Sequence, residues 1–376
     1  MKEPKIRFKE FEREWEEKNM LNTAPLQRGF DLPSHSIQTG TVPIVYSNGV
    51  LNFHSVGKCV APGLVTGRSG TIGKFTFIED GKYWPHNTSL WVTDFFNNDP
   101  KFVFYLYQTI GIEKYSTGSG VPTLNRNDVH DIIVNTPSLS EQQSIATFFT
   151  SLDEQIKASG ERVASLKQVK AASLQAMFPQ EGETSPRLRF KGFTGDWQLV
   201  TLGEIFKERT ERNRNGELLS VTMNNGIIKA SENGRSDNSS EDKSNYKVVK
   251  VGDIAYNSMR MWQGASGCSQ YEGIVSPAYT VIAPNENICS AFFSYYFKTS
   301  DVIKIFRLHS QGLTKDTWNL KYPMFSLIEL YFPNNSIEQQ KIADYFTNLD
   351  HQIALQGQRL EKLKQIKAAC LEKMFV

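Results

Sequence analysis

The sequence predicts an α+β protein with two mostly-β domains that carry packed helices and are separated by two long antiparallel coiled-coil helices. Residues 141–178 (EQQSIATFFTSLDEQIKASGERVASLKQVKAASLQAMF) recur without a gap at 338–375. A shorter match, PKIRFKEFEREW at 4–15 against PRLRFKGFTGDW at 186–197, opens each half of the chain. A self-match of this length at a fixed spacing indicates an internal duplication. We therefore expect a pseudo-twofold repeat of one structural unit.

Each 38-residue repeat has the apolar spacing of one long coiled-coil helix, with steps that alternate between four and three residues. At Lys170 and Lys367 the apolar position moves to Val169 and Ile366, which predicts a local packing adjustment. Ser140 and Ser336 are the expected N-caps. The expected seam and partner-docking positions are Ile145, Phe149, Leu152, Ile156, Val163, Leu166, Ile342, Phe346, Leu349, Ile353, Leu360 and Leu363.

The order of these segments predicts the domain organisation. We expect a first variable domain at 1–139, a first spacer helix at 140–178, a second variable domain at 179–335 with its opening tag at 186–197, and a second helix at 336–376. The first helix leads into the tag at 186–197, and the second helix would lead in the same way into the tag at 4–15 if the chain were closed into a ring. Antiparallel pairing of the helices would therefore place the variable domains at opposite ends and the two chain termini close together.

The variable domains have the composition of short strands separated by turns. In the first domain the candidate strands are 43–46, 64–66, 75–78 and 89–92, with turns at 47–49 and 79–81. Apolar aromatic runs at 101–108 and 291–297 predict helices packed on the sheets, and 253–257 and 274–282 are the expected strands of the second domain. The polar run at 231–244 predicts a loop.

Charge and cysteine usage exclude several classes of protein. The formal net charge is +2, and residues 141–178 hold four acidic and four basic side chains, so no segment has the strongly basic character of a charge-driven nucleic-acid binder. The four cysteines have no CxxC spacing, which is typical of reduced thiols in a cytoplasmic protein and implies no metal site. No run of 18 apolar residues predicts a membrane span.

Enzyme motifs are missing from the sequence. The segment 67–74 (GRSGTIGK) resembles a phosphate-binding loop, but Arg68 stands where the first glycine belongs and Phe75 where a hydroxyl would hold magnesium. No Pro-Pro pair is present for the motif with which amino-methyltransferases hold a flipped base. The six histidines are scattered, without ligand or catalytic spacing. We therefore expect a chain without a catalytic site.

The repeated helix motif, the RF-F…W tag and the phrases VPIVYSNGV, VTGRSGTIGKF and HNTSLWV together resemble the specificity subunit of type I restriction-modification systems. The resemblance implies a non-catalytic subunit in which two target recognition domains each recognise half of a split double-stranded DNA target, while the helices set the spacer. It implies two copies of a modification (methyltransferase) subunit as partners, with S-adenosylmethionine, and restriction subunits that use ATP and Mg²⁺. This chain would bind no cofactor itself, and no membrane is involved.

Two glycine-rich or polar loops in each domain are the candidate DNA contacts. Arginine and lysine pair with guanine, and asparagine or glutamine with adenine. The alternative for each such residue is a structural turn or a phosphate contact. The candidates are Arg68, Ser69, Lys74, Ser119 and Thr123 in the first domain, and Asn257, Ser258, Arg260, Gln311 and Lys315 in the second.

One alternative stays open at the level of the sequence. A coiled-coil scaffold with protein-binding arms would have the same helices and would show no DNA preference. A self-sufficient methyltransferase or nuclease is disfavoured because its motifs are missing.

Overall fold

The computed structural model describes residues 3–118, 120–223, 226–232, 242–315 and 317–376. The chain forms two compact units: unit 1 is Met1–Glu161 with Gly357–Val376, and unit 2 is Arg162–Gln356. Each unit therefore contains one mostly-β domain and parts of both long helices, α3 (Leu139–Ala176) and α8 (Ser336–Met374). The expected α+β fold is confirmed. The expected loop at 231–244 lies mostly outside the described residues.

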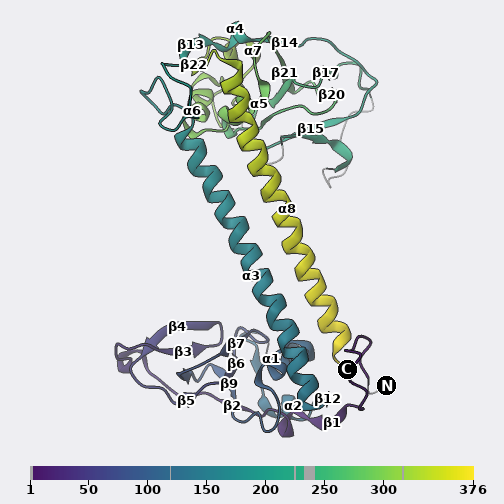
Figure 1. Ribbon diagram of the computed structural model, residues 1–376. Coiled ribbons are helices and arrows are strands. Elements are labelled where there is room, and N and C mark those ends of the chain that lie inside the picture. Colours follow the sequence, from purple (N-terminus) through teal and green to yellow (C-terminus); the bar gives the residue numbers. More distant parts are fainter. Residues whose placement is uncertain (1–2, 119, 224–225, 233–241, 316) are drawn as a thin grey trace. The chain divides into compact units, whose positions relative to one another are not determined.

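Unit 1 consists of short strands, two short helices and its share of α3 and α8 (Figure 1). Its strands are β1 (Glu16–Asn19), β2 (Leu26–Arg28), β3 (Val42–Tyr46), β4 (Gly49–His54), β5 (Cys59–Val60), β6 (Gly63–Gly67), β7 (Phe75–Ile78), β8 (Lys82–Pro85), β9 (Ser89–Val92), β10 (Ser116–Thr117), β11 (Thr123–Leu124) and β12 (Ile133–Thr136). Its short helices are α1 (Pro100–Ile110) and α2 (Arg126–His130).

Unit 2 repeats this mixture of elements. Its strands are β13 (Gln198–Thr201), β14 (Phe206–Glu208), β15 (Leu219–Thr222), β16 (Gly226–Lys229), β17 (Lys247–Val249), β18 (Ile254–Asn257), β19 (Ser266–Cys268), β20 (Gly273–Val275), β21 (Tyr279–Pro284) and β22 (Glu329–Phe332). Its short helices are α4 (Leu202–Ile205), α5 (Ser290–Tyr296), α6 (Ser300–His309) and α7 (Tyr322–Phe325).

Each unit has its own copy of one type of four-stranded antiparallel sheet. The strand order of this sheet is β2-β9-β6-β7 in unit 1 and β14-β21-β18-β19 in unit 2. The remaining strands differ, because unit 1 has a second four-stranded sheet, β4-β3-β8-β5, where unit 2 has the separate pairs β15-β16 and β17-β20. The duplicated frame thus carries two different second layers.

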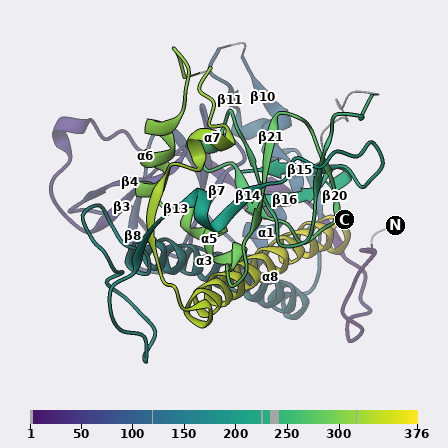
Figure 2. The ribbon, with the colours of Figure 1, turned by 90° about the horizontal axis from the view of Figure 1, so that it is seen from above.

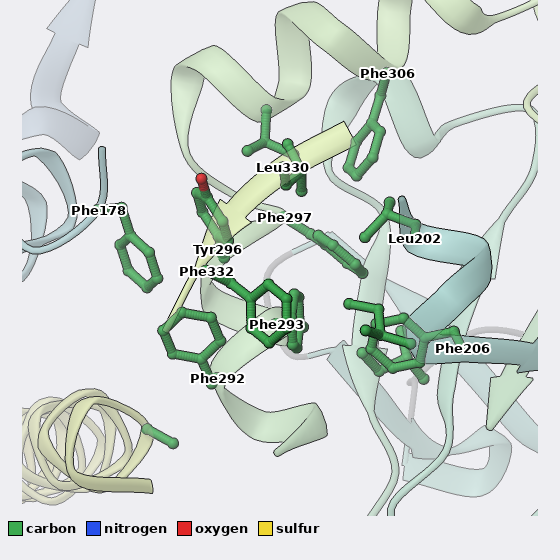
Figure 3. Close-up of a cluster of buried hydrophobic side chains, with 14 of the residues drawn as sticks. Phe178, Leu202, Phe206, Phe292, Phe293, Tyr296, Phe297, Phe306, Leu330 and Phe332 are labelled. Atoms are coloured by element: carbon green, nitrogen blue, oxygen red, sulfur yellow. The ribbon is translucent and has the colours of Figure 1, made fainter. Parts of the chain in front are cut away.

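The end of one long helix completes the core of each unit. In unit 2, Phe178 follows α3 and stacks on Tyr296 of α5 and Phe346 of α8, at ring-centroid distances of 4.8 and 5.8 Å. Figure 3 shows Phe178 beside Phe292 and Tyr296 at the edge of the aromatic cluster of α5. In unit 1, Phe375 follows α8 and packs on Phe102 and Phe149 in the same way.

Within each unit the two helices run antiparallel and side by side (Figures 1 and 2). The outer seam positions are buried as expected: Ile145, Phe149 and Leu152 in unit 1, and Leu166, Ile342, Phe346 and Leu349 in unit 2. The inner positions Ile156, Val163, Ile353, Leu360 and Leu363 are partly exposed.

The expectation that the seam moves to Val169 and Ile366 is wrong, since these side chains are 43% and 39% exposed. The lysines themselves stay at the seam. The Lys367 ammonium bonds the Asp153 carboxylate at 2.6 Å, and Lys170 pairs with Asp350 in the same way. Each ammonium also lies 5.4 Å from a tyrosine ring, Tyr105 or Tyr295. The carboxylate compensates the charge that a lysine brings into the seam.

The tags hold the beginnings of the helices. The Arg7 guanidinium donates to both carboxylate oxygens of Glu141, at 2.8 and 2.9 Å, and the Trp15 indole donates to the same carboxylate. This bidentate contact raises the pKa of Arg7. In unit 2, Arg189 makes the same bidentate contact with Glu338.

The N-caps of the long helices differ from expectation, whereas the expected proximity of the two chain ends is confirmed. The N-cap of α8 is Asn335, whose side-chain oxygen accepts from the backbone N–H of Ile337, and α3 begins at Leu139, so Ser336 and Ser140 already lie inside the helices. The expected proximity of the two chain ends is confirmed in unit 1, where the Ile6 N–H donates to the Lys373 carbonyl at 3.0 Å.

Charge placed at a buried seam position should destabilise the protein. Leu349 is 7% exposed and Leu355, on the same helix, is 50% exposed. We expect Leu349→Asp to lower the free energy of unfolding by roughly 3–5 kcal/mol, because it removes a buried side chain and buries a carboxylate. Leu355→Asp is the matched control and should change it little. Equal melting temperatures for the two variants in thermal unfolding would show that the seam is assigned wrongly.

The two clamps should act independently on the two tags. Glu141→Gln removes the buried carboxylate that pairs with Arg7 and should speed amide hydrogen exchange over residues 4–15 but not over 186–197, because the Glu338 clamp is intact. Glu338→Gln should do the reverse. Exchange measured by mass spectrometry on both variants tests this, and loosening of both tags by either substitution would contradict it.

Candidate nucleic-acid interface

In unit 1 the structure brings together two loops that the sequence separates. The turn after β6 carries Arg68 and Ser69, and the β10–β11 hairpin carries Thr123. The Leu124 N–H donates to the Arg68 carbonyl at 2.8 Å, the Gly70 N–H donates to the Pro122 carbonyl at 3.0 Å, and Ser69 and Thr123 form an isolated antiparallel bridge. Three of the candidate residues thus form one surface.

The other two candidates of unit 1 are placed differently. The Lys74 ammonium donates to the Asn48 carbonyl at 2.9 Å, so this side chain points to the β3–β4 turn. Ser119 lies outside the described residues.

Gly67 explains the tight turn that follows β6, because a Cβ at this position would lie 1.8 Å from the Thr71 carbonyl oxygen. Only glycine allows the chain to fold back here.

Unit 2 has the same loop pair. The Leu320 N–H donates to the Ser258 carbonyl at 2.8 Å, which repeats the contact between Leu124 and Arg68. Gln311 and Asn319 exchange two backbone hydrogen bonds of 2.9 and 2.8 Å and close the base of the hairpin. The sequence candidates of unit 2 therefore also lie on two adjacent loops.

Exposure separates these candidates into two groups. Arg260, Gln311 and Lys315 are exposed. Ser258 is only 6% exposed and its hydroxyl bonds the Thr280 hydroxyl at 2.8 Å, so its side chain supports the loop from within. The Asn257 side chain accepts from the Met259 N–H at 3.0 Å and so stabilises the turn of its own loop.

A further aromatic cluster lies at the same place in unit 2. Trp262 and Trp318 meet edge to face with ring centroids 5.2 Å apart, and the Arg307 guanidinium lies 5.1 Å from the Trp318 ring. The sequence analysis did not single out Trp318 or Arg307. The sequence did hold one signal for this cluster, because Trp262 and Trp318 fall in or beside the two loops that carry the DNA-contact candidates of unit 2.

Potential metal ligands and thiols occur across the described part of the chain. It contains no group of three or more His, Cys, Asp and Glu side chains that could hold a metal ion. Burial raises the pKa of Cys59 to about 11 and that of Cys268 to about 12, so both thiols are protonated and unreactive near neutral pH. No helix in the described ranges is long and apolar enough to cross a membrane.

Two copies of one sheet, each presenting a pair of adjoining loops, define a two-domain recognition protein. Comparison with known proteins is specific about the class: residues 43–168 and 194–365 match the family described as the type I restriction modification DNA specificity domain. Because this match covers most of the chain, the chain belongs to that family.

Two relatives illustrate the similarity. The type I restriction enzyme HindI specificity subunit of Haemophilus influenzae is 26% identical over 194 residues, which are 48% of this chain and 41% of the relative. The chain thus matches less than half the length of that relative. The crystal structure of the type I restriction-modification S subunit from M. genitalium aligns over 100% of this chain and 99% of its own, with a TM-score of 0.66 and 16% identity. At this identity the likeness concerns the fold.

Proposed function

We propose that this chain is the non-catalytic DNA-recognition subunit of a type I restriction-modification complex in the cytoplasm. It recognises an asymmetric target of two unlike half-sites, one with each recognition domain, residues 1–139 and 179–335, while the helices 140–178 and 336–376 set the spacer. The observation that carries this proposal is the repeated loop pair on a repeated sheet with unlike second layers. The same frame presents two different surfaces.

The loop pairs have the chemistry that a duplex requires. Exposed Arg260, Gln311 and Lys315 in unit 2, and Arg68 with Thr123 in unit 1, supply donors for base edges and phosphates. The backbone bonds between the loops hold the two loops of each pair together before DNA arrives, which lowers the entropy cost of binding. The near-neutral charge of the chain means that non-specific affinity is low, so base contacts decide binding.

Partner subunits supply the chemistry. Two modification subunits, which carry S-adenosylmethionine, dock on the long helices, and restriction subunits that use ATP and Mg²⁺ join this complex. On α3, two hollows of about 440 and 550 Å³ share Gln143 and Thr147 and offer a docking surface of mixed polarity. We expect the chain alone to transfer no methyl group and to cut no DNA, because its sequence lacks the Pro-Pro motif of amino-methyltransferases and a complete phosphate-binding loop.

The DNA target of the complex should consist of two unlike halves that can be changed one at a time. Methylome sequencing of cells that carry this chain and its methyltransferase partner should give two short unlike sequences with a fixed spacer. Replacing residues 20–137 by those of a related chain should change one half only, and replacing 202–333 should change the other. A palindromic target, or one replacement that changes both halves, would refute the proposal; a lack of any DNA preference would instead support a protein-binding scaffold.

Single arginines should act on single half-sites. We expect Arg68→Ala to weaken discrimination in the half recognised by unit 1 and Arg260→Ala in the other half, each by about 1–3 kcal/mol, the range for one good base contact. Arg13→Ala is the control, since the Arg13 side chain is 73% exposed and pairs with Glu16 at the surface. Competition binding with duplexes mutated in one half at a time measures this, and a uniform loss across all duplexes would identify phosphate contacts instead.

A further inference from the structure

The hairpin of unit 2 ends in a turn that its own hydrogen bonds hold in shape. The Trp318 and Thr317 N–H groups donate to the Thr314 carbonyl at 3.1 and 3.0 Å, and the Thr317 hydroxyl accepts from the Thr314 N–H at 3.1 Å. Gly312 has φ +138°, and a Cβ there would lie 2.6 Å from the Thr317 carbonyl oxygen. The hairpin is therefore preorganised rather than ordered on binding.

An aromatic and cationic stack supports the base of this hairpin. Trp318, the last residue before the Asn319–Gln311 closure, lies between the Trp262 ring and the Arg307 guanidinium. Trp262 belongs to the neighbouring loop, where its indole N–H donates to the Met259 carbonyl at 3.0 Å. Arg307 comes from α6. Two other elements, the loop of Trp262 and helix α6, thus contact Trp318 and support the base of the hairpin.

The tip carries an apolar side chain that touches nothing in the described part of the chain. Leu313 is 101% exposed, next to exposed Thr314 and Lys315. A single exposed leucine is ordinary, but this one stands at the end of a braced hairpin beside the candidate DNA contacts. In unit 1 the equivalent hairpin has Gly118, Gly120 and Val121, and its Pro122 carbonyl is bonded back to Gly70. The exposed apolar side chain of that hairpin is the smaller Val121, which is 68% exposed.

We propose that Leu313 enters the minor groove of the half-site recognised by unit 2 and partly unstacks one base step there, with the Trp262–Trp318–Arg307 stack bracing the hairpin. This inference rests on the proposed function of the chain. Leucine is among the side chains that act as wedges in minor-groove binding, where unstacking is offset by additional contact with the bent duplex. Lys315, exposed two residues from Leu313, supplies positive charge for the phosphates. Unit 2 therefore deforms its half-site at this base step.

The test uses the full chain in complex with its methyltransferase subunit and a duplex carrying the target found by methylome sequencing. Permanganate oxidation of unstacked thymines, and 2-aminopurine in place of each adenine other than the methylated ones, report stacking in both half-sites. We expect a wild-type signal at one step of the unit 2 half-site. Leu313→Ser should abolish this signal and weaken binding roughly tenfold, as expected for losing the burial of one leucine side chain.

Two control variants make the result specific. Leu313→Met keeps an apolar wedge and should keep the signal. Leu327→Ser removes a leucine of the same unit that is 63% exposed but lies on the turn after α7, and it should change neither signal nor affinity. Base flipping by the methyltransferase gives the same background in all variants, so the difference between wild type and Leu313→Ser isolates the hairpin.

Several outcomes would overturn the wedge while leaving the proposed function intact. Two of them concern the unstacking signal: it is missing in wild type, or it is unchanged in Leu313→Ser. A third is an affinity loss in Leu313→Ser that disappears when thymine is replaced by deoxyuridine, which would indicate a contact with the thymine methyl group. The fourth is loss of the methyltransferase subunit from Leu313→Ser with unchanged DNA affinity, which would indicate a protein contact. Absence of any bipartite target would overturn both proposals, because no unit 2 half-site would then exist.

Discussion

The structure depends on two phenylalanines, Phe178 and Phe375, that follow the ends of the long helices. Phe178 is fully buried among Trp197, Phe292, Tyr296 and Phe346, and Phe375 is 9% exposed beside Phe102 and Phe149. Burying one such ring contributes about 2–3 kcal/mol. Since Phe375 ends the second half of the sequence but completes the core of unit 1, neither half of the sequence encloses its core alone. The duplicated helices are therefore part of both cores as well as connectors.

The lysines in the seam show how polar contacts fix the register of these helices. Asp153 accepts from Lys367 and from the Tyr105 hydroxyl, and Asp350 accepts from Lys170 and the Tyr295 hydroxyl. A pure apolar seam tolerates slippage by one helical turn, whereas a half-buried ammonium requires its carboxylate at one position. Each aspartate also bonds a helix of its own domain, α1 or α5, and so couples helix register to domain position.

Much of the fold followed from sequence, because duplication and apolar spacing are local signals. They predicted the long helices within a few residues, and turn residues at 47–49 and 79–81 separated the strands correctly. Asn335 as a cap, Arg7 as the partner of Glu141 and the contact of Trp318 with Trp262 were not predictable in this way. These are pairings between residues distant in sequence, or choices between adjacent polar residues, and only the folded chain decides them.

Separate hydrophobic clusters explain how two different recognition surfaces can share one frame. In unit 1 the second sheet packs in two small clusters, one around Ile44 with Trp84 and one in which Val45 and Tyr83 meet Val65 of the common sheet. In unit 2 a cluster including Leu219 and Val249 plays this part. The main cores, which contain the helix ends and tags, are distinct from these clusters. Substitutions in groups that share few contacts act nearly additively on stability. The second layers and hairpin tips can therefore diverge without disturbing the helices, which is the physical condition for one scaffold to acquire two unlike half-site specificities.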